Sequence, residues 1–167
     1  MHNKLFVYLT LFLIGTMKKE DYIDYHIKTS WHSLSRLYNL KAQKHQITTS
    51  VAFILLNISI SEGTPATKIA PLMGLESRSL TRALKSLEER GFIYREKDPY
   101  DKRSIRIYLT EKGIEKKGKA IDTVRAFNRF VRERIPEDKL NTFLQVSRLI
   151  VDWTENNEEL KKLINAD

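Results

Sequence analysis

The chain contains no cysteine among its 167 residues, and this absence excludes several kinds of chemistry. Disulfide bonds, zinc sites built on thiolates and sensing of peroxide through a thiol all require a cysteine side chain. Glycine is also scarce, with 6 residues, and most of the glycines stand where a predicted helix stops. The lack of cysteine is compatible with the cytoplasm, which is the compartment we expect.

Motifs of common enzyme classes are missing as well. The sequence has no H-E-x-x-H motif, no Ser-His-Asp order, no phosphate-cradling glycine loop and no carboxylates paired for acid–base catalysis. His26 and His32 are six positions apart and so lie on different faces of a helix, which argues against a shared metal site. We therefore expect a protein that is not an enzyme and that needs neither a metal nor a cofactor.

An apolar run from Leu5 to Gly15 opens the chain. At about eleven residues it is well short of the roughly 20 that a membrane-spanning helix requires. Lys4 precedes it, as in a secretory signal, but no A-x-A-like cleavage site follows it. Three interpretations of residues 1–16 stay open: a start-site extension before Met17, an extra helix packed on a dimer, or a membrane-targeting segment.

Positive charge is what the chain has in excess. The 29 Lys and Arg residues against 21 Asp and Glu give a net charge of +8, which attracts polyanions. Nucleic acid is therefore the first partner to consider and an anionic membrane surface the second, although we expect no membrane partner. A length of 167 residues fits one globular domain with an added dimerisation element.

The spacing of apolar residues predicts two helices in the first third of the chain. A long amphipathic helix is expected over residues 18–43, because apolar side chains recur along one face at Ile27, Trp31, Leu34 and Tyr38. The next helix, capped by Thr48 or Thr49, is apolar almost all round and should be buried. We expect Gly63 to end it.

The following segment predicts two short helices joined by a tight turn. Thr64 and Pro65 suit the cap and the first position of a helix that ends near Met73, and Gly74 closes it. The next helix is capped by Ser77 and stopped by a glycine, with an apolar stripe and a cationic stripe on opposite sides: Leu80, Leu84 and Leu87 against Arg78, Arg82 and Lys85, with Gly91 as the stop. This pattern is typical of a helix-turn-helix.

A hairpin and two more helices complete the predicted fold. Residues 92–96 and 105–109 are expected to form a two-stranded wing around a charged loop. Thr110 and Pro136 then open two long helices with apolar stripes. The fold class is therefore mainly α (α+β), and long terminal helices with apolar stripes call for a two-fold partner. The domains are expected at 1–16 (apolar leader), 17–47 (N-terminal dimerisation helix), 48–113 (winged helix-turn-helix lobe) and 114–167 (C-terminal dimerisation helices).

Two motifs resemble those of the multiple antibiotic resistance regulator (MarR) family. One is L-x-x-R-G-F-I at residues 87–93, and the other is D-P-x-D-K-R-S at 98–104, followed by a strand and L-T-x-K-G at 109–113. The helix order is similar over residues 18–163. The resemblance implies a homodimer that binds a pseudo-palindromic operator, with a recognition helix in the major groove and a wing at the minor groove. It also implies repression that is released by a small, often phenolic, ligand.

The candidate DNA-binding residues lie on the second short helix and on the wing. Hydroxyl, guanidinium and ammonium groups reach phosphates and base edges, which selects Ser77, Arg78, Ser79, Thr81, Arg82 and Lys85. Arg78 and Arg82 are the candidates for base readout, and Ser77, Ser79 and Lys85 for phosphate contacts.

The wing contributes a second set of candidates. Asp101 and Arg103 resemble the family's D-x-R pair, in which the arginine enters the minor groove and the aspartate holds its side chain. Lys102 and Ser104 would support them as phosphate contacts. Arg106 is expected to point outward, either as a surface cation or as a DNA contact.

The first long helix carries candidates for an effector pocket. Trp31, His32 and Tyr38, with His26 and Arg36 nearby, could line such a pocket for a small aromatic ligand. The apolar stripe favours the core for Trp31 and Tyr38 instead, and the histidines are expected to be hydrogen-bonded polar groups. Together with these residues, the resemblance to the MarR family implies a ligand-responsive, homodimeric, DNA-binding repressor. The alternative is a winged-helix module for protein interaction, or an architectural nucleic-acid binder, without an operator.

Overall fold

The computed structural model describes residues 18–73, 77–99 and 101–166, so the predictions for residues 1–16 and for the turn at Gly74 lie outside the described residues. The described residues divide into two units, with the boundary after residue 120. The first unit combines helices with a small antiparallel sheet, and the described part of the second is helical. The expected mainly α-helical fold class is confirmed.

The first two long elements follow the sequence pattern with shifted ends. A 3-10 turn, η1 (Lys19–Asp21), precedes helix α2 (Ile23–Lys44). Helix α3 (Thr49–Leu56) is capped by Thr48, as predicted, because the Thr48 hydroxyl accepts a hydrogen bond from the backbone N–H of Val51 at 3.2 Å. The prediction that Gly63 ends this helix is wrong, because the backbone N–H of Asn57 already closes it on the carbonyls of the last turn.

Thr64 and Pro65 form a strand instead of opening a helix. They make up β1 (Thr64–Pro65), which pairs antiparallel with β3 (Ile105–Leu109), and helix α4 (Ala66–Met73) starts after them. Strand β2 (Ile93–Lys97) pairs with the other edge of β3, which gives the order β1-β3-β2. The Thr64 hydroxyl bonds the backbone before the strand, at Asn57 and Ser59, so it is not a helix cap. The sheet therefore has a third strand that local sequence did not predict.

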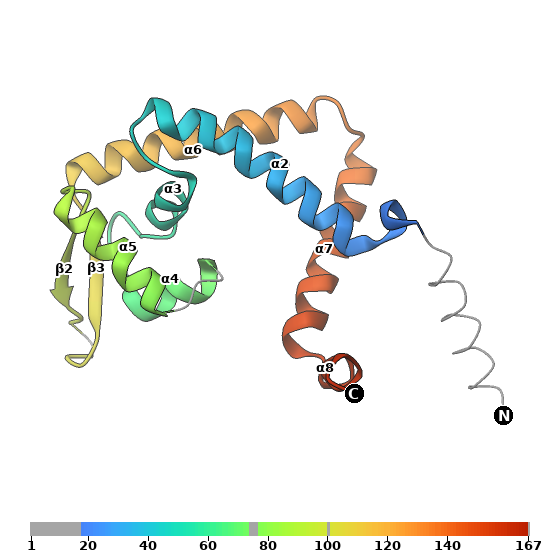
Figure 1. The fold of residues 1–167 in the computed structure, drawn as a ribbon. Coiled ribbons are helices and arrows are strands. Elements are labelled where there is room, and N and C mark those ends of the chain that lie inside the picture. Colours follow the sequence, from blue (N-terminus) through green and yellow to red (C-terminus); the bar gives the residue numbers. More distant parts are fainter. Residues whose placement is uncertain (1–17, 74–76, 100, 167) are drawn as a thin grey trace. The chain divides into compact units, whose positions relative to one another are not determined.

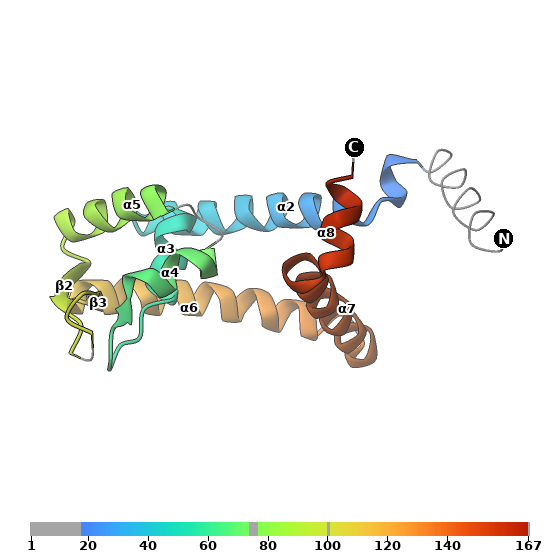
Figure 2. The same ribbon diagram turned by 90° about the horizontal axis from the view of Figure 1, so that it is seen from below.

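The core of the first unit forms around helix α5 (Ser77–Glu89). Its leucine stripe is buried as predicted, at Leu80, Leu84 and Leu87, and packs into a cluster with the sheet and helices α3 and α4. Each fully buried aliphatic side chain contributes about 1.5 to 3 kcal/mol. Gly91 has the expected left-handed backbone, with φ of 68°, and turns the chain from α5 into β2 (Figures 1 and 2).

The start of helix α6 (Glu111–Arg132) is tied to this core. The Thr110 hydroxyl accepts a hydrogen bond from the backbone N–H of Gly113 at 3.1 Å, which confirms the predicted cap. One turn further, Lys117 donates from Nζ to the carbonyl of Leu56 at 3.0 Å and to that of Ile58. A cation at the C-terminal end of α3 is favourable for the helix dipole. Burial lowers the pKa of the Lys117 ammonium group.

The second unit contains the end of α6, helix α7 (Glu137–Asn156) and helix α8 (Glu158–Ile164). Pro136 precedes α7, as predicted, but Asn157 ends it and caps α8 by accepting a hydrogen bond from Leu160 at 2.9 Å. Helix α8 leaves in a different direction from α7 (Figure 2).

No side chain of α7 or α8 is buried, and large apolar side chains stand exposed: Phe143, Leu144, Val146, Leu149, Val151, Trp153, Leu163 and Ile164. Within the described ranges, no helix combines the length and apolar character needed to cross a bilayer.

Two glycines with similar backbone angles test how tightly the turn before β1 packs. A Cβ at Gly63 (φ +64°) would lie 2.7 Å from the carbonyl of Ile107 and from the ring of Tyr108, whereas a Cβ at Gly91 (φ +68°) meets nothing within 4 Å. Both alanine substitutions should lose about 1 to 2 kcal/mol of unfolding free energy through the left-handed backbone. Gly63→Ala should lose a further 1 to 3 kcal/mol or so through overlap. Equal losses in urea unfolding would contradict this packing.

Candidate nucleic-acid interface

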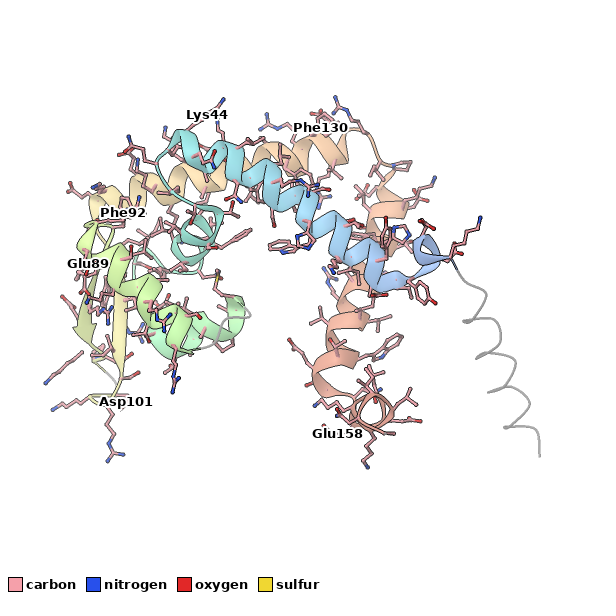
Figure 3. All side chains as sticks on the ribbon, in the orientation of Figure 1. Lys44, Glu89, Phe92, Asp101, Phe130 and Glu158 are labelled. Atoms are coloured by element: carbon pink, nitrogen blue, oxygen red, sulfur yellow. The ribbon has the colours of Figure 1, made fainter. Side chains whose placement is uncertain are left out.

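Helix α5 presents its cations on the side opposite the buried leucines. Arg78, Arg82 and Lys85 are all exposed, as are Ser79 and Thr81, and Ser77 is the first residue of the helix. The ammonium of Lys85 lies 3.9 Å from the Glu89 carboxylate, near the end of the helix (Figure 3). Exposed pairs of this kind are weak, so this contact leaves the charge available to an anion. The outer face of α5 therefore carries three accessible cations.

The tip of the β2–β3 hairpin carries the second set of predicted residues. Asp101, Lys102 and Arg103 are exposed there, Ser104 is half-buried, and Asp101 stands at the tip in Figure 3. The Asp101 carboxylate accepts a hydrogen bond from the backbone N–H of Arg103 at 3.0 Å. The prediction was that Asp101 holds the side chain of Arg103, but this hydrogen bond is made to the backbone of Arg103. This contact shapes the turn and leaves the Arg103 guanidinium exposed to solvent.

Arg106 is not the outward-pointing cation that strand alternation predicted. Its Nε lies 2.9 Å from Oδ2 of Asp98, and the exposed fractions of the two side chains are 14% and 5%. Its Nη1 also donates to the backbone carbonyl of Glu62 at 2.9 Å. No local sequence signal pairs these residues, because they meet only when the strands bring residues 62, 98 and 106 together. The Arg106 guanidinium is therefore bonded to acceptors within the protein.

Arg90, from the L-x-x-R-G-F-I motif, also has a structural position. Its guanidinium donates to the carbonyl of Gln46, a non-glycine residue with a left-handed φ of 59°, and lies 4.7 Å from the centre of the Phe92 ring. The ammonium of Lys112 donates to the Arg90 carbonyl at 3.0 Å. These contacts fix the junction between α5 and β2 (Phe92, Figure 3) to the α2–α3 turn and to the start of α6. The arginine of the motif therefore ties this junction to the neighbouring elements of the first unit.

The predicted effector residues are only partly brought together. Trp31 stacks on Phe53 of α3, with ring centres 5.8 Å apart and planes 24° apart, and Tyr38 lies edge-on to the same ring at 6.2 Å. Tyr38 is buried, and burial raises the pKa of its hydroxyl. Trp31 is 51% exposed, so its assignment to the core is wrong for the single chain. His32 is exposed and outside this cluster, whereas Phe53 belongs to it and was not predicted as a site residue.

The excess of positive charge lies in the unit that carries α5 and the hairpin. Residues 1–120 contain 21 Lys and Arg against 12 Asp and Glu, whereas residues 121–167 contain 8 against 9. The second unit is therefore close to neutral. Long-range attraction for a polyanion is thus concentrated where the exposed cations of α5 and the hairpin lie.

Comparison with known proteins agrees with this geometry. The MarR family model matches residues 47–105, which run from two residues before α3 to the first residue of β3. The chain is 32% identical over 106 residues to the organic hydroperoxide resistance transcriptional regulator of Bacillus subtilis (strain 168), covering 64% of this chain and 72% of the relative. It is 35% identical over 88 residues to the HTH-type transcriptional regulator TtmR of Methylorubrum extorquens (strain PA1), covering 53% of this chain but only 45% of that relative.

Solved structures show the same fold. The transcriptional regulator SlyA is 26% identical, with a TM-score of 0.68 over 86% of this chain and 99% of its own. CouR of Rhodococcus jostii RHA1, solved with p-coumaroyl-CoA, is 22% identical, with a TM-score of 0.72 over 85% of this chain and 97% of its own. The CouR repressor bound to a 23-mer DNA duplex has a TM-score of 0.68 at 23% identity, over 79% of this chain and 94% of its own.

The family match, the relatives and the fold agree with a helix-turn-helix that has a cationic outer face and is followed by a hairpin with an exposed arginine at its tip. The chain belongs to the MarR family of winged-helix, DNA-binding transcriptional regulators.

Proposed function

We propose that this MarR-family protein is a repressor that binds a pseudo-palindromic operator as a homodimer and releases it when a small aromatic ligand binds. It has no catalytic activity in this proposal. The observation that carries it is the shared core of α5 and the hairpin, from which Arg82 and Arg103 project as exposed cations. A helix and a wing held on one core can engage a major groove and the adjacent minor groove together.

The homodimer is supported by the exposed apolar surface of the second unit. Helix α7 has 20 residues and none is buried, although it carries most of the large apolar side chains named above. The apolar face of an amphipathic helix normally packs against another element, and contiguous exposed apolar surface marks an interaction site. A second copy of the chain would cover this surface and would supply the second DNA-binding lobe that a palindromic site requires.

The aromatic cluster supports a small aromatic ligand as the signal. Trp31 offers a half-exposed ring next to Phe53 and Tyr38, and CouR, which shares the fold, was solved with p-coumaroyl-CoA. The B. subtilis relative is named for organic hydroperoxide resistance, but this chain has no cysteine with which to sense a peroxide. A non-covalent ligand is therefore the signal that this sequence favours.

Affinity for a selected operator tests the DNA contacts. After selection of the preferred duplex with the wild-type protein, Arg82→Ala and Arg103→Ala should each weaken binding by about 5- to 150-fold, which corresponds to the 1 to 3 kcal/mol typical of a good base contact. Lys85→Ala should weaken binding to all duplexes and reduce the salt dependence by about one counterion. Lys44→Ala, which removes a cation from the last turn of α2, is the matched control.

Methylation protection separates the two kinds of contact, because arginine bonded to a guanine shields its N7. Protection should be lost with Arg78→Ala or Arg82→Ala and kept with Lys85→Ala. If selection yields no preferred duplex, or if both arginine variants bind like wild type, the protein acts instead as an interaction or architectural module without an operator.

A charge placed in the apolar surface of α7 tests the homodimer. Phe143→Glu should raise the dissociation constant of the dimer at least 30-fold, about 2 kcal/mol, because the carboxylate would lose water in the interface. Leu72→Glu on α4 is the control, since the two side chains are 65% and 66% exposed in the single chain. Sedimentation velocity over a range of concentrations measures both. A wild-type protein that sediments as a monomer, or an unaffected Phe143→Glu dimer, would refute the dimer.

Tryptophan fluorescence tests the aromatic site. In a Trp153→Phe background Trp31 is the single tryptophan of the chain, and p-coumaroyl-CoA or 4-hydroxybenzoate should quench it while releasing DNA. Phe53→Ala should weaken both effects together, because Phe53 packs against Trp31 and Tyr38. His32→Ala, which changes an exposed neighbour outside the cluster, should leave both unchanged. Quenching without DNA release would separate ligand binding from regulation.

A further inference from the structure

The wing contains an ion pair, where its two strands meet the tip loop, that the DNA contacts described above do not use. We call Glu62, Asp98 and Arg106 the wing clamp, because the Arg106 guanidinium bonds the Asp98 carboxylate and the Glu62 carbonyl, each at 2.9 Å. Asp98 follows β2, Arg106 lies in β3, and Glu62 stands just before β1. One side chain thus joins the loop end of the hairpin to the segment that leads into α4.

The clamp continues into the tip of the wing through hydrogen bonds. The second carboxylate oxygen of Asp98, Oδ1, accepts from the backbone N–H of Asp101 at 3.3 Å, and the backbone N–H of Asp98 donates to Ser104 at 3.0 Å. The Asp101 carboxylate in turn accepts from the backbone N–H of Arg103. An unbroken series of contacts therefore runs from Arg106, through Asp98 and Asp101, to the backbone of Arg103.

Three features restrict the geometry of the wing clamp. The planar guanidinium holds its donors at fixed angles, so Arg106 can satisfy two acceptors only when the wing and the turn before β1 have one relative position. Gly63 lets that turn approach β3 closely, since a Cβ there would lie 2.7 Å from the Ile107 carbonyl. The Asp98 carboxylate is nearly fully buried, which favours a paired over an unpaired state.

We propose that Arg106 is a positioning residue for DNA binding: through Asp98 it fixes the tip of the wing so that Arg103 meets the DNA, and it makes no DNA contact itself. This inference rests on the proposed role of Arg103. It assigns to Arg106 a function that neither a surface cation nor a phosphate contact would have, because its effect on affinity must pass through Arg103.

A double-mutant cycle on the selected operator tests this dependence. Arg103→Ala should weaken binding at least fivefold in the wild-type protein but less than twofold in an Arg106→Leu background, where the wing is no longer positioned. Arg95→Leu is the matched control: it removes the same charge from the neighbouring strand, where Arg95 pairs with Glu88 at 2.9 Å. In that background Arg103→Ala should cost as much as in wild type. Equal costs in all three backgrounds would overturn the proposal.

Amide hydrogen exchange tests the clamp without DNA. The backbone N–H groups of Asp101 and Ser104 are bonded within the tip, and their exchange should speed up at least tenfold in Arg106→Leu but not in Arg95→Leu. If Arg103→Ala has no effect on DNA binding in wild type, the proposed wing contact fails, and the exchange rates alone decide whether the clamp exists. Unchanged exchange in Arg106→Leu would refute it.

A conservative variant covers the case in which Arg106→Leu does not fold. Arg106→Lys keeps the charge beside Asp98 but loses the fork that also reaches Glu62. It should give an intermediate cost for Arg103→Ala and intermediate exchange at the tip, with a cooperative unfolding transition like that of wild type. A lysine variant indistinguishable from wild type in both measurements would show that charge neutralisation is enough and would overturn the positioning role.

Discussion

Burial of the leucine stripe of α5 decides which side chains this helix offers to the outside. Leu80, Leu84 and Leu87 are almost fully buried, and each contributes about 1.5 to 3 kcal/mol by leaving water. Rotating the helix to hide its arginines would expose these leucines and bring cations into the core. The orientation of Arg78 and Arg82 is therefore a consequence of apolar packing, which fixes it without any contact from the arginines themselves.

The same core also holds the hairpin, so the helix and the wing cannot move independently of each other. Ile93 and Ile107, one from each strand of the hairpin, are buried in the cluster that contains the leucines of α5. Arg90 then joins the end of α5 to the α2–α3 turn, and Lys117 joins α6 to the end of α3. The surfaces proposed for two neighbouring grooves are therefore built on one hydrophobic core.

Features governed by local patterns were predicted well from the sequence. The leucine stripe, strand β3, the caps at Thr48 and Thr110 and the left-handed Gly91 all depend on neighbours within about four positions, and all are confirmed. Strand β1 was missed because its two residues become a strand only by pairing with β3, more than forty positions away. The short helix α8 was not predicted as a separate helix, because only Asn157 separates it from α7.

For the candidate site too, features set by local sequence were predicted and features set by distant partners were not. Periodicity and resemblance were enough to place exposed cations on α5 and on the wing tip, because each face is defined by its own helix or loop. The prediction that the Arg106 side chain points outward was wrong. Alternation along a strand indicates only whether a side chain faces the core, and it does not reveal that the Asp98 carboxylate lies on the opposite face. The exposure of Trp31 was missed for a related reason: an apolar stripe predicts burial without saying whether the same chain or a second one provides it.

The presence of an ion pair at the loop end of the wing itself carries information. Replacing a buried ion pair by apolar side chains is often neutral or stabilising, so stability alone gives little reason for Asp98 and Arg106 to be charged. Two apolar side chains could fill the same space, but they could not accept the backbone N–H of Asp101 or donate to the Glu62 carbonyl. Those backbone groups would then lose the side-chain partners that define the turn. The pair therefore does what packing cannot do, which is to give a polar loop at the edge of a small sheet a single conformation.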